Sequence, residues 1–159
     1  EPSLILESIE RVGYYAWGDQ HILAIFIVGN PPTLHIGDTR TGKSEMITEN
    51  IGRSLHKDPY ESAFSFVHKV SDSEWWIKRI DISSREITPL IQTLTGSEDY
   101  AWSPDSSLFM AQGSTLHRCN PKSDSQWLVI ANFADAGIKQ ITRIAVTPNG
   151  KRLAFVSVE

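Results

Sequence analysis

A repeat of about 40 residues constrains the fold of this chain more than any other feature of its sequence. Three short segments each combine apolar or aromatic residues with a turn sequence that contains Asp or Asn, as in YAWSPD at 100–105 and IAVTPNG at 144–150, and SLHKDP at 54–59 is a degenerate fourth copy. Aligned on Ala16, Leu55, Ala101 and Ala145, the four copies are spaced by 39, 46 and 44 residues. Such self-similarity predicts one structural unit that recurs along the chain.

Each unit is expected to hold four short strands. An apolar run follows every turn sequence, at 22–28, 63–67, 108–111 and 153–156. The second half of the unit also repeats, because TLHIGD at 33–38 matches TLHRCN at 115–120, and each is followed by a polar turn and another strand. Four strands in about 40 residues are typical of a β-propeller blade. The sequence therefore predicts an all-β propeller of four-stranded antiparallel blades.

The blade boundaries follow from the repeat. We expect about three complete blades, at 13–51, 52–96 and 97–139, in an incomplete ring. Residues 1–12 are expected to hold the last strand of a preceding blade, at 3–6, and residues 140–159 to begin a further blade. Unpaired strand edges at both ends would be met by a missing part of the propeller, a second chain or a homodimer.

The turn sequences resemble those of a known family. AWSPDS at 101–106 and TPNGKRLAFV at 147–156 are similar to the W-S-P-D-G-K-x-I-A-F pattern that opens each blade in TolB-like bacterial β-propellers. The chain departs from that pattern at 55–59, where the turn is displaced, and at Ser106, where Gly is usual. The resemblance implies a non-catalytic module that binds a protein or peptide or acts as a scaffold, in the periplasm or exported.

Composition excludes several other classes of function. The net charge of −4 argues against a nucleic-acid surface, which needs clustered Lys and Arg. The sequence contains no run of 18 apolar residues, so we expect no membrane insertion. The single cysteine, Cys119, and the spacing of the five histidines do not fit a metal site, and we expect no cofactor.

One motif competes with this interpretation. GDTRTGKS at 37–44 fits the phosphate-binding pattern G-x-x-x-x-G-K-S. Such a loop must lie between a parallel strand and a helix, whose amino-terminal amides hold the phosphates. Residues 44–51 read instead as a strand that ends in a turn, so we expect the motif to form a hairpin connection.

The alignment also predicts a candidate binding site. Two residues before each aligned position lie Tyr14, Arg53, Asp99 and Arg143, which we expect to form one layer around the central channel. Glu98 lies one step nearer the channel mouth. The layer is open to two interpretations: a set of salt bridges that neutralises charge between blades, or a polar funnel that receives a peptide or small ligand from the side of the loops between blades.

Two further functions stay open at this point. In the first, the chain is the propeller of a prolyl-oligopeptidase-like serine peptidase, where it would gate access to a hydrolase domain that this sequence does not contain. In the second, the propeller is purely structural and binds no ligand. No catalytic residue is predicted in either case, since the hydrolase pattern G-x-S-x-G does not occur.

Overall fold

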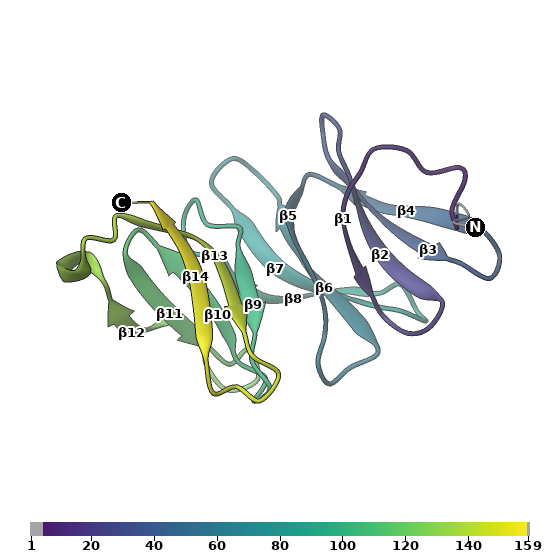
Figure 1. Ribbon diagram of the computed structural model, residues 1–159. Coiled ribbons are helices and arrows are strands. Elements are labelled where there is room, and N and C mark those ends of the chain that lie inside the picture. The colour runs from purple at the N-terminus through teal and green to yellow at the C-terminus, as the bar shows by residue number, and fades with distance from the viewer. Residues whose placement is uncertain (1–4, 159) are drawn as a thin grey trace, which may run out of the picture.

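The computed structural model describes residues 5–158. Fourteen strands and one short 3-10 helix make up this part of the chain (Figure 1). The strands form three four-stranded sheets and one two-stranded sheet, all antiparallel and each built from consecutive strands. The predicted all-β class and the four-stranded blades are confirmed.

Sheets 1 and 2 have the same strand order, from the inner strand outwards. Sheet 1 comprises β1 (Val12–Trp17), β2 (Ile22–Ile27), β3 (Thr33–Asp38) and β4 (Lys43–Glu49). Sheet 2 comprises β5 (Ile51–Lys57), β6 (Ala63–Lys69), β7 (Trp75–Asp81) and β8 (Ile87–Gln92). Within these two sheets, turns of four or five residues join successive strands, as the turn sequences predicted.

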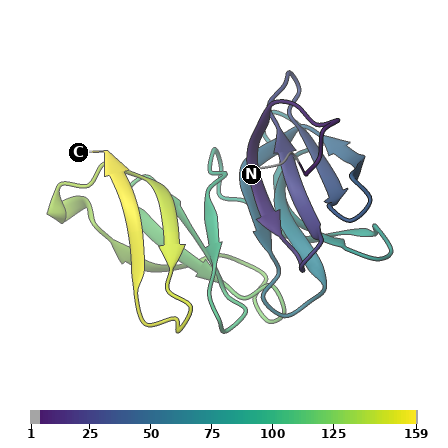
Figure 2. The same cartoon turned by 45° about the vertical axis from the view of Figure 1, so that its right-hand side comes forward.

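Sheets 3 and 4 continue the series. Sheet 3 comprises β9 (Tyr100–Trp102), β10 (Leu108–Gln112), β11 (Thr115–Cys119) and β12 (Leu128–Asn132). After the 3-10 helix η1 (Ala134–Ala136), sheet 4 consists of β13 (Gln140–Val146) and β14 (Leu153–Val158). Sheets 1 and 4 stand at opposite ends of the row of sheets (Figure 2).

The segment before β1 differs from the expected strand. Residues 3 and 4 of the strand expected at 3–6 lie outside the described residues. Residues 5–11 form a bend and a turn. Leu6 of this segment lies against sheet 1, where a Cβ at residue 37 would come within 2.8 Å of its Cδ1, so Gly37 provides the room for it.

Hydrophobic packing between successive sheets forms the core. One cluster joins sheets 1 and 2, a second joins sheets 2 and 3, and a third joins sheets 3 and 4. Phe64 and Phe66 of β6 contribute to the first cluster, whereas Val67 of the same strand contributes to the second. Each inner sheet is therefore apolar on both faces and is stabilised by a neighbour on each side.

Two equivalent tyrosines show how a neighbouring sheet changes burial. Tyr15 and Tyr100 occupy the same place in their sheets, because Tyr15 pairs with Ile25 as Tyr100 pairs with Met110. Tyr100 is 2% exposed, and its hydroxyl donates a 2.8 Å hydrogen bond to Ser65 of sheet 2. Tyr15 is 60% exposed, since no described sheet packs on that face of sheet 1.

This difference predicts unequal effects of the same substitution. Tyr100→Phe removes the buried hydrogen bond to Ser65 and should lower the free energy of unfolding by about 1 kcal/mol. Tyr15→Phe changes an exposed group and should lower it by less than about 0.5 kcal/mol. Urea titration followed by circular dichroism measures both. Equal losses would contradict the described packing of sheet 2 on sheet 3.

Candidate binding site at the inner strands

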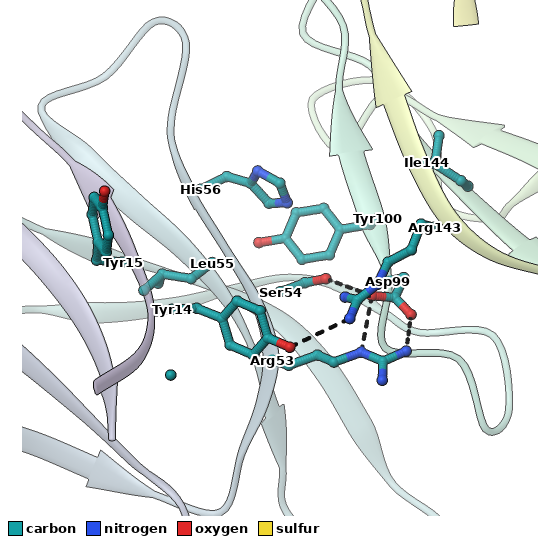
Figure 3. Close-up of a pocket in the computed structure, with 11 residues that line it drawn as sticks. Tyr14, Tyr15, Arg53, Ser54, Leu55, His56, Asp99, Tyr100, Arg143 and Ile144 are labelled. Atoms are coloured by element: carbon teal, nitrogen blue, oxygen red, sulfur yellow. Dashed lines mark hydrogen bonds and ion pairs between the residues drawn. The ribbon is translucent and has the colours of Figure 1, made fainter. Parts of the chain in front are cut away.

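The structure brings the four residues of the predicted layer together. Tyr14 lies on β1, Arg53 on β5 and Arg143 on β13, which are the inner strands of their sheets. Asp99 lies one residue before β9 rather than within it. The side chains converge on Asp99, as Figure 3 shows.

The carboxylate of Asp99 joins two arginines from different sheets. Arg53 donates to it through Nε at 3.2 Å and through Nη2 at 2.5 Å, so the interaction is bidentate. Arg143 donates to Oδ1 at 2.8 Å, and the Ser54 hydroxyl adds a longer bond of 3.4 Å. Sheets 2, 3 and 4 are therefore connected through one acidic side chain.

Glu98 extends this cluster toward the loops between sheets. Its carboxylate lies 2.8 Å from Lys69 Nζ and 3.4 Å from Arg53 Nε. Gly52 provides the space, because a Cβ there would lie 3.0 Å from Glu98 Oε2. Lys69 Nζ also lies 4.3 Å from the centre of the Trp75 ring, which is a cation–π contact.

The connected charges do not balance. Three cationic side chains, those of Arg53, Lys69 and Arg143, face the two carboxylates of Glu98 and Asp99. Arg143 has the least occupied donor group: it bonds Asp99 and, at 3.4 Å, Tyr14 Oη, and its side chain is 43% exposed. An arginine carries five N–H donors, so Arg143 retains donors for an anionic group.

A hollow of about 330 Å³ adjoins the cluster. Its apolar wall includes Leu55 and Ile144, and its polar wall includes Tyr14, Arg53 and Arg143 (Figure 3). The remaining lining residues come from the same four inner segments: Gly13, Tyr15, Ser54, His56, Asp99 and Tyr100. An apolar surface beside a few convergent polar groups is the usual character of a ligand site.

A smaller hollow of about 100 Å³ lies nearer the loops between sheets. Glu98, Asp99 and Arg53 line it together with residues 96–97 and 140–142. This is the side from which a ligand was predicted to arrive. The larger hollow instead lies on the other side of Asp99, where Tyr100 and Ile144 of the inner strands line it. The ion cluster therefore lies between two hollows.

In sheet 2 the repeat lies one residue later than the predicted alignment on Leu55. Tyr100 and Ile144 each pack against the preceding sheet, and so does Leu55. In sheet 2 the residue equivalent to Ala16 and Ala101 is thus His56, which pairs with Ser65 and faces sheet 3. The irregular pairing of β5 between Ile51 and Leu55 explains why Arg53 still reaches Asp99.

His56 is a member of the site that the sequence analysis missed. Its ring contacts that of Tyr100 edge-on, with 4.7 Å between ring centres. Loss of solvent around the ring lowers the pKa of His56 below the ordinary histidine value, although a hydrogen bond with the Tyr100 backbone and the nearby Asp99 carboxylate oppose the shift. Aligning sheet 2 one residue later would have placed His56 and Ser54 beside the predicted layer.

The phosphate-loop motif forms a hairpin. Residues 37–44 run from the end of β3 through a turn to the start of β4, and Asp38 pairs with Lys43 across the antiparallel ladder. The Asp38 carboxylate accepts a 2.8 Å bond from the Arg40 amide, and Gly42 has the positive φ of 68° that the turn requires. A strand follows where a nucleotide site needs a helix, which confirms the hairpin interpretation.

Comparison with known proteins gives matches in structure alone. No family model matches the chain, and no curated protein matches it in sequence. TolB from Acinetobacter baumannii is similar in structure, with a TM-score of 0.67 and 14% identity over 91% of this chain and 37% of TolB. The tricorn protease gives a TM-score of 0.61 at 16% identity, over 96% of this chain and 16% of the protease.

A third structure, YCF48 bound to D1 peptide, gives a TM-score of 0.55 at 14% identity, over 97% of this chain and 62% of YCF48. The fold is that of a β-propeller. The chain spans less than two thirds of each of these three structures. Among the described residues, no helix is long and apolar enough to cross a membrane.

The half-buried His56 predicts how stability depends on pH. Because burial lowers the pKa of His56 in the folded state, the unfolded state binds more protons below about pH 6.5. The free energy of unfolding should therefore fall as the pH is lowered from 7 to 5, together with contributions of the same sign from His35 and His68. His56→Gln should make this dependence shallower. An unchanged slope in urea titrations across this range would contradict the assignment.

Proposed function

We propose that this chain is part of a TolB-like β-propeller that acts as a non-catalytic protein- or peptide-binding module. The observation that carries the proposal is the charge of the inner cluster, where three cations face two carboxylates beside a hollow of about 330 Å³. The ligand group that this arrangement favours is an acidic side chain or a terminal carboxylate.

The geometry supports recognition of one anionic group. Asp99 fixes Arg53 and Arg143 in place through charge-assisted hydrogen bonds, so binding would cost little side-chain entropy at those residues. Arg143 keeps free donors at the edge of the hollow, and its guanidinium carbon lies 5.8 Å from the centre of the Tyr14 ring. Leu55 and Ile144 offer apolar contact to the rest of the ligand.

The local charge differs in sign from that of the whole chain. A net charge of −4 would repel an acidic peptide from most of the surface. A cationic site within an acidic chain would therefore confer selectivity, because an acidic ligand is attracted to that site and repelled by most of the remaining surface. The salt-bridge interpretation explains the contacts of Asp99 but does not explain the additional cation.

Partner, location and lack of catalysis are parts of the same proposal. YCF48 was solved with a peptide, and the TolB-like resemblance implies a protein partner and a periplasmic or exported location. The alternative is a propeller that gates substrate access to a serine peptidase domain, and the likeness to the tricorn protease is in keeping with it. A hydrolase sequence in the full-length gene would favour that alternative.

Fluorescence anisotropy with two short peptides, polyglutamate and polyglutamine with the same neutral label, tests the proposal. We expect the chain to bind polyglutamate more tightly, and Arg143→Ala to weaken that binding about tenfold by removing a charge-assisted contact. Arg152→Ala, an exposed change in the β13–β14 turn, is the matched control and should leave the affinity unchanged. Equal binding of the two peptides, or no effect of Arg143→Ala, would contradict the proposal.

A further inference from the structure

The outer edges of the three four-stranded sheets differ in how they are protected. The sheet orders make β4, β8 and β12 the outermost strands, each paired on one side alone within residues 5–158. An unpaired edge presents backbone donors and acceptors that another strand can pair with. Soluble proteins commonly block such edges with charged residues or proline.

Two of the three edges carry such protection. β4 contains Lys43, Glu45 and Glu49, all of which are exposed. β8 contains the exposed Pro89, which has no N–H to donate. An added strand would meet charged side chains on the first edge and a missing donor on the second.

β12 has neither form of protection. Its sequence, LVIAN, contains no charged residue and no proline. Leu128, Val129 and Ile130 are 53%, 65% and 46% exposed, so three consecutive apolar side chains are in contact with solvent. β12 lies at the outer side of sheet 3, on the far side of β11 from β10 (Figure 1).

The repeat also shows which way a backbone donor of β12 points. Each outer pair of strands has the same irregularity, one residue being skipped after the pairs Leu34–Thr48, Ile77–Ile91 and Leu116–Ala131. The next paired residues on the outer strands are therefore equivalent: Met46, Pro89 and Val129.

Proline at this position lacks an N–H, yet β8 remains paired with β7 on both sides of it. The N–H at this position is thus not needed for the ladder within the sheet. Val129 carries an N–H at the equivalent position of β12, where it is available to an added strand.

We propose that β12 pairs with β12 of a second copy of this chain, in antiparallel orientation across a two-fold axis. A two-fold contact places the same residues opposite one another, so charged strands would repel. β12 is the one outer strand of the three that carries neither a charge nor a proline.

Sedimentation velocity of the 159-residue chain over a hundredfold range of concentration tests this proposal. We expect a reversible monomer–dimer equilibrium. Val129→Pro should weaken dimerisation at least about tenfold, because it removes the outward donor and introduces the residue that β8 already accommodates. Leu128→Glu should do the same, since it places like charges near the two-fold axis.

Met46→Pro, at the equivalent position of β4, is the matched control and should leave the dimer unchanged. Circular dichroism and thermal unfolding of each variant show that its sheet is intact. A chain that stays monomeric at all concentrations would overturn the proposal. A dimer that survives both Val129→Pro and Leu128→Glu would also overturn it, because the contact would then lie on an open sheet face. The same holds if Val129→Pro alone is well folded and dimerises as tightly as the original chain.

Discussion

Every four-stranded sheet in this chain depends on a neighbour for its stability, and this requirement determines the architecture. The inner sheets are apolar on both faces, and strands such as β6 send Phe64 and Phe66 to one side and Val67 to the other. Alone, such a sheet would leave both of its apolar faces in water, which costs about 25 cal/mol for each square ångström of apolar surface. The sheets therefore stack in chain order, and their inner strands are brought close together.

The inner strands must then accommodate polar groups in a confined space. Asp99 meets this need by accepting hydrogen bonds from Arg53, Ser54 and Arg143, while Glu98 pairs with Lys69. The same contacts fix the side chains that line the larger hollow. Structural and functional interpretations of the layer are thus compatible: the ion pairs hold neighbouring sheets together, and the remaining cation gives the hollow its expected preference for an acidic group.

The sequence predicted the fold well because the fold is local and repeated. Most of the turns contain Pro, Gly, Asp or Asn, so the spacing of turns defines the four strands of a blade. The layer of Tyr14, Arg53, Asp99 and Arg143 could be placed because equivalent residues of successive blades lie at equal distances from the axis. His56 was missed because the second copy lacks a clear turn motif, so its alignment was one residue early. Lys69 was missed because it comes from a second strand, and no repeat marks its contact with Glu98.

The shared carboxylate of Asp99 is the central claim of this account, and a double-mutant cycle tests it most directly. The free energies of unfolding of Arg53→Ala, Asp99→Ala and the double variant give the coupling energy between the two residues. We predict a coupling of about 1–2 kcal/mol, larger than that of the more exposed Arg118–Asp105 pair, whose atoms lie 3.1 Å apart. A coupling no larger than that of Arg118–Asp105 would contradict the claim that Asp99 joins the sheets at their inner strands.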